Sequence, residues 1–495
     1  MGRIINQTMN MRKTLLFIGL MLAMVMTAQP KREFRGAWIQ SVNGQFMGMG
    51  KEAMQKTLSY QLDELQKDGC NVIIFQVRPE CDALYESIYE PWSYYLTGQQ
   101  GVAPNPYWDP LAWMIEQSHK RGMELHAWIN PYRAKTKVAH ANASNHVVSQ
   151  HPERCFDYDG LTLLNPALKE NRDYICQVVT DILERYDVDG LHIDDYFYPY
   201  PTPGINIPDE AYFRANPQGF TDIGDWRRNN VNLFIEQLWA TIRTVKPWVK
   251  FGVSPFGIYR NMKNDPNGSK TNGLQNYDQL YADVLLWVKN GWVDYCVPQI
   301  YWEIGNKAAD YAELMYWWNK NCTKTTLVIG EDIERTAKFN QMEQKMKMHA
   351  ELPNIQGTVL WYAKAAVDNV GNYGTRLRNF YWRYPALQPA MKHIDNKAPK
   401  KPRKVQVIDI EGQKVLFWTA PKGEGWKDAA ASYAIYRFGP DDKVDINDVT
   451  KLVTITNDTH YELPREEWGS KVIYAVTALD RMQNESSYKK VKVKY

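Results

Sequence analysis

Short apolar runs alternate with amphipathic segments over most of this chain. Each apolar run ends in polar or aromatic residues and is followed by apolar positions at helical spacing. The predicted strands are residues 34–40, 72–78, 124–130, 190–195, 250–257, 293–302, 326–332 and 357–363. Eight strand–helix units in series predict an α/β fold, a closed (β/α)8 TIM barrel over residues 33–392.

The helices between the strands have readable boundaries. Asp109 is a typical N-cap, Pro110 suits the first helical position, and Gly122 ends that helix. Residues 134–165 and 198–224 do not fit the repeat and are predicted to be large loops that follow two of the strands.

The pattern changes after the barrel. Residues 393–402 are rich in Lys and Pro and predict a linker. Residues 403–495 then alternate with the period of strands, at 405–410, 414–418, 432–438, 451–455 and 472–479. This predicts an all-β sandwich, and the stretch 474–480 followed by Asn484 resembles the late strand and loop of a fibronectin type III domain.

The N-terminus has the features of a targeting segment. Arg12 and Lys13 precede an apolar run at residues 15–26, which is too short to span a bilayer, and small residues follow it. We therefore expect residues 1–28 to be a signal peptide that is removed, and the mature chain to be secreted or periplasmic without a transmembrane helix.

Composition narrows the choice of ligand. A net charge of +3 over 495 residues gives no reason to expect a nucleic-acid partner. The chain has 18 Trp and 31 Tyr, and aromatic rings stack on the apolar C–H faces of sugars. The excess favours an oligo- or polysaccharide ligand, although most rings serve the core.

In a TIM barrel the active site lies at the carboxyl ends of the strands. These ends hold a set of polar and aromatic candidates for substrate binding: Arg78, Asp82, His126, Trp128, Asn130, Arg133, His192, Tyr196, Tyr198, Gln299, Tyr301, Trp302 and Trp361. For Arg78, pairing with a nearby carboxylate competes with gripping an anionic group of the ligand. No metal or cofactor is predicted, because His126 and His192 have no third histidine at metal spacing.

The strand at residues 190–195 is the most informative. Leu191 and Ile193 should face the helices, so that His192 and Asp194 point into the barrel and Asp195 lies at the strand end. Two adjacent acids disfavour joint ionisation, and an acid beside a carboxylate is the equipment for glycosidic cleavage. The structural alternatives for this pair are a metal site or a helix cap.

The second carboxylate has several candidates. We assign Glu303, with Glu331 and Asp332 after the next strand and Glu80 and Asp82 after the second strand as alternatives. The separation of the two acids decides between inverting and retaining chemistry.

Long motifs carry a family resemblance over about 360 residues. They are residues 35–39, 75–79, 82–85, 91–93, 109–111, 119–122, 126–133, 165–166, 186–199, 254–257, 298–302 and 357 onward. Together they resemble the bacterial glycosyl-hydrolase-like family related to the family-10 glycosidases.

The resemblance implies an envelope glycosidase. Some relatives act on peptidoglycan strands stripped of their stem peptides, so cell-wall glycan is the expected substrate. Relatives are often lipoproteins, and this chain departs from them by lacking the lipobox cysteine. Relatives do not reliably carry an acid at the position of Glu331, which disfavours that residue as a shared nucleophile.

Two other functions compete with a glycosidase. The first is a catalytically silent glycan-binding protein, whose C-terminal domain docks to an envelope partner. The second is a metal-dependent deacetylase, which the missing histidine cluster disfavours.

Overall fold

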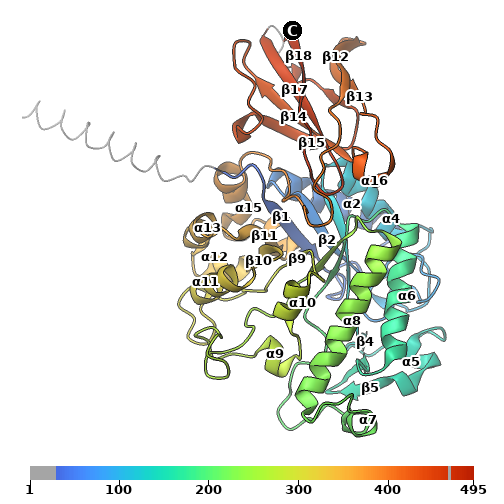
Figure 1. Ribbon diagram of the computed structural model, residues 1–495. Helices are drawn as coiled ribbons and strands as arrows, with labels where there is room; N and C mark the ends of the chain where they lie inside the picture. Colours follow the sequence, from blue (N-terminus) through green and yellow to red (C-terminus); the bar gives the residue numbers. More distant parts are fainter. Residues whose placement is uncertain (1–28, 466–469, 495) are drawn as a thin grey trace, which may run out of the picture.

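The computed structural model describes residues 29–465 and 470–494, so the predicted signal peptide lies outside the described part. Figure 1 shows a barrel with a β-sandwich above one end. The barrel strands are β1 (Phe34–Ile39), β2 (Val72–Arg78), β3 (Glu124–Ile129), β7 (Gly190–Ile193), β8 (Lys250–Val253), β9 (Tyr295–Cys296), β10 (Thr326–Asp332) and β11 (Ile355–Trp361). They close in the order β1-β11-β10-β9-β8-β7-β3-β2, and every pairing is parallel. The predicted (β/α)8 barrel is confirmed.

One barrel strand is much shorter than predicted. The apolar run at residues 293–302 forms only the two-residue strand β9. Pro298 follows it and has no N–H for the ladder, so pairing continues only as isolated bridges from Gln299 to Phe256 and Gly330.

Helices surround the barrel. The longer ones are α2 (Lys51–Lys67), α4 (Pro110–Lys120), α6 (Lys169–Arg185), α8 (Ile223–Val245), α10 (Val284–Asn290), α11 (Tyr311–Asn321) and α13 (Met342–Glu351). The shorter ones are α3 (Tyr94–Thr97), α5 (Val147–Gln150), α7 (Glu210–Ala215), α9 (Asn276–Gln279), α12 (Ile333–Lys338), α14 (Ala363–Val367) and α15 (Tyr373–Arg376). As predicted, Asp109 caps α4, and its side chain accepts a hydrogen bond from the Ala112 N–H. None of the helices in the described ranges is long and apolar enough to cross a membrane.

Alternation along the strands produces two cores. Leu191 and Ile193 belong to the outer core between strands and helices, as predicted. The inner core fills the lumen with apolar side chains such as Trp38 and Val72, together with Tyr295. His192 points into this lumen, as its register predicts, and contacts Tyr295.

The predicted loop at residues 134–165 is a small sheet. β4 (Arg133–Lys135), β5 (Cys155–Tyr158) and β6 (Leu161–Leu164) pair antiparallel in the order β4-β6-β5. We call this sheet the rim sheet. Figure 1 places β4 and β5 at the end of the barrel away from the sandwich, which is the end where the strands finish.

The C-terminal region is an all-β sandwich, as predicted. One sheet holds β12 (Arg403–Ile410), β13 (Gln413–Thr419) and β16 (His460–Glu462). The other holds β15 (Leu452–Thr456), β14 (Ser432–Phe438), β17 (Lys471–Leu479) and β18 (Lys489–Lys494), and the short helix α16 (Gly425–Asp428) follows β13. Apolar side chains from both sheets share one core, but the fibronectin type III assignment stays a prediction.

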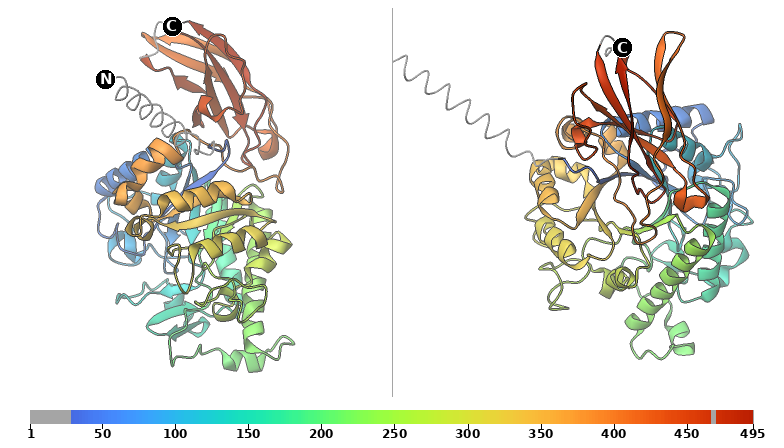
Figure 2. Two further views of the ribbon diagram at one scale, coloured as in Figure 1. Left: turned by 90° about the vertical axis from the view of Figure 1, so that its left-hand side faces the viewer. Right: turned by 45° about the horizontal axis from the view of Figure 1, so that its top comes forward.

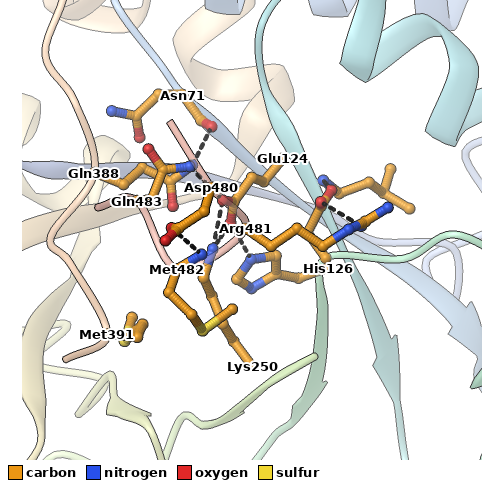
Figure 3. Close-up of polar contacts among 12 residues, drawn as sticks. Asn71, Glu124, His126, Lys250, Gln388, Met391, Asp480, Arg481, Met482 and Gln483 are labelled. Atoms are coloured by element: carbon orange, nitrogen blue, oxygen red, sulfur yellow. Dashed lines mark hydrogen bonds and ion pairs between the residues drawn. The ribbon is translucent and has the colours of Figure 1, made fainter. Parts of the chain in front are cut away.

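The turn between β17 and β18 reaches the amino-terminal end of the barrel (Figure 3). Met482 is 1% exposed and packs in the inner core, and Arg481 forms an ion pair of 2.8 Å with Asp187. Gln483 contacts Glu124, which also pairs with the buried Lys250. We call residues 480–485 the floor turn, because Met482 of this turn packs against the lumen side chains at the amino-terminal end of the barrel.

Candidate active site

Asp194 lies directly after β7, at the carboxyl end of the barrel. Its carboxylate accepts hydrogen bonds from Trp128 Nε1 at 3.1 Å and from Asn130 Nδ2 at 3.2 Å, and from the Tyr196 N–H at 3.3 Å. Burial raises its pKa, and the positive charge of Arg133 with these hydrogen bonds opposes that rise. Three N–H donors and a nearby cation favour the ionised carboxylate.

Asp195 is held by a separate set of partners. Gln299 Nε2 donates to Oδ1 at 3.1 Å, and the Tyr200 hydroxyl donates to Oδ2. Gln299 is itself fixed, because its amide also donates to the Ser254 carbonyl at 2.8 Å. Burial first, and then repulsion by Asp194, raise the pKa of Asp195 to about 7. The pair therefore places a carboxyl group that binds a proton near neutral pH beside a carboxylate.

An aromatic wall adjoins this pair. The rings of Tyr301 and Trp361 stack with centroids 5.8 Å apart, both are half-buried, and Trp38 packs edge-on against each of them. Trp302 is also half-buried and packs edge-on against Phe256. These rings are positioned to stack on a sugar.

Trp128, a predicted substrate-binding residue, contacts the acid pair instead of lying open to a ligand. It is 6% exposed, and its indole N–H is used on Asp194. Its role is to orient the carboxylate rather than to present a ring face.

Two other predicted binding residues are placed as structural groups. Arg78 is fully buried and forms a bidentate pair with Glu90 at 2.6–3.0 Å, while its remaining donor bonds the Asn130 and Pro131 carbonyls. Tyr198 is also fully buried and packs against Arg227 beneath α8. A ligand cannot reach either side chain, because the fold uses every donor of Arg78 and covers the Tyr198 ring.

The two histidines lie deep in the lumen. His126 Nδ1 and His192 Nδ1 flank the Tyr295 hydroxyl at 2.7 and 3.0 Å, and His192 Nε2 lies 2.9 Å from Ser254 Oγ. Both rings are fully buried, so they support the strands rather than contact substrate. Burial lowers the pKa of His192, which keeps that ring neutral.

Asp82 is a buried loop anchor. It accepts hydrogen bonds from the Tyr94 N–H and from Gln100 Nε2, both at 3.0 Å. Burial raises its pKa to about 6. Its partners belong to the loops after β2, and none of them contacts Asp194 or Asp195 among the described residues.

Glu303, the predicted second acid, is directed to the loop after β9. Asn306 donates to its carboxylate at 2.8 Å and Arg335 lies 3.5 Å away. Burial raises the pKa of Glu303, but the hydrogen bonds from Asn306 and from its own backbone N–H, with the charges of Arg335 and Lys345, lower it overall, which suits an ionised loop acid rather than a proton donor. No contact in the described ranges joins it to Asp194 or Asp195.

The alternative acids after β10 have structural roles. Glu331 faces the helices and forms a buried ion pair with Lys345 of α13 at 2.8 Å. Asp332 caps α12 by accepting from the Arg335 N–H at 2.9 Å. The geometry therefore concentrates the acids that share a site in the pair after β7.

Sequence reasoning missed two residues of the site. Tyr200 and Ser254 hold Asp195 and Gln299, respectively. Tyr200 follows five residues after Asp195 in a segment with three other aromatic residues, and the pattern alone did not separate it from them.

Over residues 29–465 and 470–494, no group of three or more His, Cys, Asp or Glu side chains is arranged to hold a metal ion. The features of the site are two buried acids, a row of amide and indole donors, and half-buried aromatic rings.

A closed parallel barrel with such a site at its carboxyl end defines a glycosyl-hydrolase-like protein, a class that acts on glycans. The chain belongs to the glycosyl hydrolase-like 10 family, whose model matches residues 33–348. It is similar to glycosyl hydrolase YngK of Bacillus subtilis strain 168, with 36% identity over 486 residues that cover 94% of each chain.

It is also similar to glycosyl hydrolase DigH of Escherichia coli strain K12, with 36% identity over 371 residues that cover 68% of this chain and 84% of DigH. Among solved structures, it is similar to the PgaB (BpsB) glycoside hydrolase domain from Bordetella bronchiseptica. That match has 12% identity and a TM-score of 0.45, and it covers 68% of this chain and 99% of that domain.

Proposed function

We propose that the protein hydrolyses glycosidic bonds in cell-wall glycan and that Asp194 and Asp195 carry the reaction. The observation that carries this proposal is the different environment of the two acids. Asp195 has a pKa raised to about 7, whereas Asp194 is surrounded by donors and lies near Arg133. Burial raises the pKa of Asp194 as well, but the donors and the cation around it favour its ionised form, so that Asp195 is the acid that holds a proton near neutral pH.

The roles follow from these environments. Asp195 donates its proton to the oxygen of the leaving sugar, and Tyr200 and Gln299 orient it for that transfer. Asp194 stabilises the positive charge that develops on the sugar ring at bond cleavage, because its own charge is fixed by Trp128 and Asn130. Water then adds to the anomeric carbon of the sugar cation and gives its proton to the deprotonated Asp195, which restores the acid for the next cycle.

The substrate class rests on the aromatic wall and on the family. Tyr301 and Trp361 offer stacked, half-buried rings, and YngK and DigH are both named glycosyl hydrolases. Peptidoglycan strands without stem peptides are the proposed substrate, as the sequence resemblance implies.

Export is part of the proposal. The basic residues Arg12 and Lys13 before the apolar run at residues 15–26 support a signal peptide and a secreted or periplasmic mature protein. Cell fractionation, with the N-terminus of the mature chain determined by sequencing, tests this, and recovery of an uncleaved chain in the cytoplasm would contradict it.

The activity is tested with purified mature protein and glycan strands freed of peptides. Asp194→Asn and Asp195→Asn should each lose activity by about a hundredfold or more, the usual loss when a general acid or base is removed. Asp458→Asn, on the exposed surface of the sandwich, is the matched control and should keep wild-type activity. Circular dichroism checks that all three proteins fold.

Other outcomes select other functions. Near-normal activity in both aspartate variants, with loss in Glu303→Gln, would return the chemistry to Glu303. Glycan binding without any hydrolysis by the wild type would favour the silent binding protein, and loss of activity on chelation would favour a metal-dependent deacetylase.

A further inference from the structure

A cavity of about 360 Å³ opens at Tyr196, the residue after the acid pair, and residues of the rim sheet form much of its wall. Its lining includes Arg133, Lys137 and Tyr196 and the apolar side chains of Val138, Leu161 and Leu163. This volume is at the small end of the range of about 300–1,000 Å³ for small-molecule sites. The cavity belongs to the same site, because Tyr196 N–H bonds Asp194 and Tyr196 lines the cavity wall.

Arg133 is an unusual cation in this cavity. It is 8% exposed, and its guanidinium lies over the Tyr196 ring with its Cζ 5.1 Å from the ring centroid. Nε donates to the Pro79 carbonyl at 3.0 Å, but the two terminal nitrogens donate to no protein acceptor within the described residues. No carboxylate of the described chain lies within ion-pair distance of it, although burying an unpaired charge is costly.

Lys137 provides the contrast. It lines the same cavity, but its ammonium pairs with Asp159 at 2.8 Å and its side chain is 61% exposed. The charge of Lys137 is thus satisfied within the protein, whereas that of Arg133 is available to a ligand.

We propose that Arg133 binds a carboxylate carried by a sugar next to the cleaved bond, so that the cavity selects anionic glycans. The proposal rests on the proposed function and specifies the substrate of that site. A planar guanidinium with both terminal nitrogens free matches a carboxylate in bidentate geometry. The apolar walls at Val138, Leu161 and Leu163 suit the uncharged remainder of the sugar and its alkyl substituent.

Arg133 is also fixed in place for this role. Its backbone N–H donates to Asn130 Oδ1 at 2.9 Å, and the Asn130 amide donates to Asp194. β4 pairs Arg133 with Leu163 of β6, so the rim sheet holds both the cation and the apolar wall. Binding of the carboxylate is thereby placed at a constant position relative to the acid pair.

The test compares two forms of one oligosaccharide: strands whose alternate sugars carry lactyl carboxylates, and the same strands after reduction of the carboxyl groups to alcohols. Calorimetry measures binding to the Asp195→Asn variant of the full mature protein, because this variant lacks the proposed proton donor and should not hydrolyse the ligand. We expect the carboxylated form to bind about ten- to a hundredfold more tightly, the range for hydrogen bonds to a charged group. Arg133→Met in the same background should bring the two affinities together.

Lys137→Met is the matched control and should keep the preference for the carboxylated form. Equal binding of the two forms by the parent protein, or a preference that survives Arg133→Met, would overturn the proposal. In the protein with Asp195 intact, the ratio of kcat/KM for the two forms should follow the binding ratio. A general effect of Arg133 on the charge of Asp194 would lower both kcat/KM values and leave their ratio unchanged.

Failure of the proposed function looks different. If the wild-type protein binds the carboxylated form selectively but hydrolyses neither form, the proposed subsite stands and the proposed glycosidase activity is overturned. If the wild-type protein hydrolyses both forms equally, the proposed glycosidase activity stands and the proposed subsite is overturned.

Discussion

Gln483, in the floor turn of the sandwich, donates a hydrogen bond of 2.8 Å from Nε2 to Oε1 of Glu124, the first residue of β3 (Figure 3). The other Glu124 oxygen lies 3.1 Å from His126 Nε2, and both oxygens contact Lys250. The C-terminal domain therefore supplies part of the polar network inside the barrel. Figure 2 shows the sandwich seated against the barrel from two further directions.

Replacement of Met482 by alanine tests how much the floor turn stabilises the barrel. Met482 is 1% exposed in the inner core, so Met482→Ala should lower the free energy of unfolding by about 2–5 kcal/mol. Urea titration followed by tryptophan fluorescence measures the loss. Met262→Ala is the matched control, because Met262 is 43% exposed, and an equal effect of the two substitutions would contradict the floor role.

Removal of the Tyr295 hydroxyl should also destabilise the fold. Tyr295→Phe leaves the facing nitrogens of His126 and His192 without their shared partner in the buried lumen. The expected cost is about 1–3 kcal/mol in unfolding free energy. Tyr60→Phe, at a side chain that is 57% exposed, should cost nothing measurable, and a neutral Tyr295→Phe would show that the histidines find other partners.

Stability should depend on pH through Asp195. Its pKa is about 7 in the folded protein against 3.8 for an ordinary aspartate, so the folded state binds the proton more tightly than the unfolded chain. This contribution is fully present below about pH 3.8 and is lost as the pH rises through about 7. Asp195→Asn lacks it.

The variant should therefore gain stability relative to wild type as the pH rises from about 4 to about 8. Denaturant titrations of both proteins across that range give the difference, and the titrating groups that do not interact with Asp195 cancel in the comparison. A difference that does not change with pH would mean that Asp195 titrates alike in both states.

The aromatic wall should contribute mainly to binding. Tyr301→Ala and Trp361→Ala each remove a half-buried ring from the stacked pair. We expect KM for the glycan to rise by about tenfold, in line with a loss of about 1 kcal/mol or more of ring contact. Tyr107→Ala is the control, because this exposed ring lies in the loop before α4 and is not part of the aromatic wall. An unchanged KM with reduced kcat would instead give these rings a role in the chemical step.

The barrel was predictable because its signal is local and periodic. The register of β7 placed His192 inward and Leu191 and Ile193 outward from the sequence alone. The same register brought Asp194 to the lumen edge, where Trp128 and Asn130 of the neighbouring strand end meet it.

Long-range partners left no such signal. Glu90, which forms the ion pair with Arg78, lies in a loop without periodic residues. The sequence around either residue therefore did not predict this pair. Tyr198 shares the strand-end position of the binding residues, yet α8 covers it. The floor turn lies about 360 residues after Glu124 in the chain, and no periodicity links the two.

The rim sheet is an insertion in one strand–helix connection of the barrel, between β3 and α6. Arg133 and the apolar residues Val138, Leu161 and Leu163 of the cavity come from this segment, whereas the two acids directly follow β7. Exchange of the segment for one of different sequence would alter which sugars are accepted, while the two acids would stay on the connection that follows β7. Glycan preference and catalysis thus depend on different segments of the chain, which meet where Asn130 contacts Asp194.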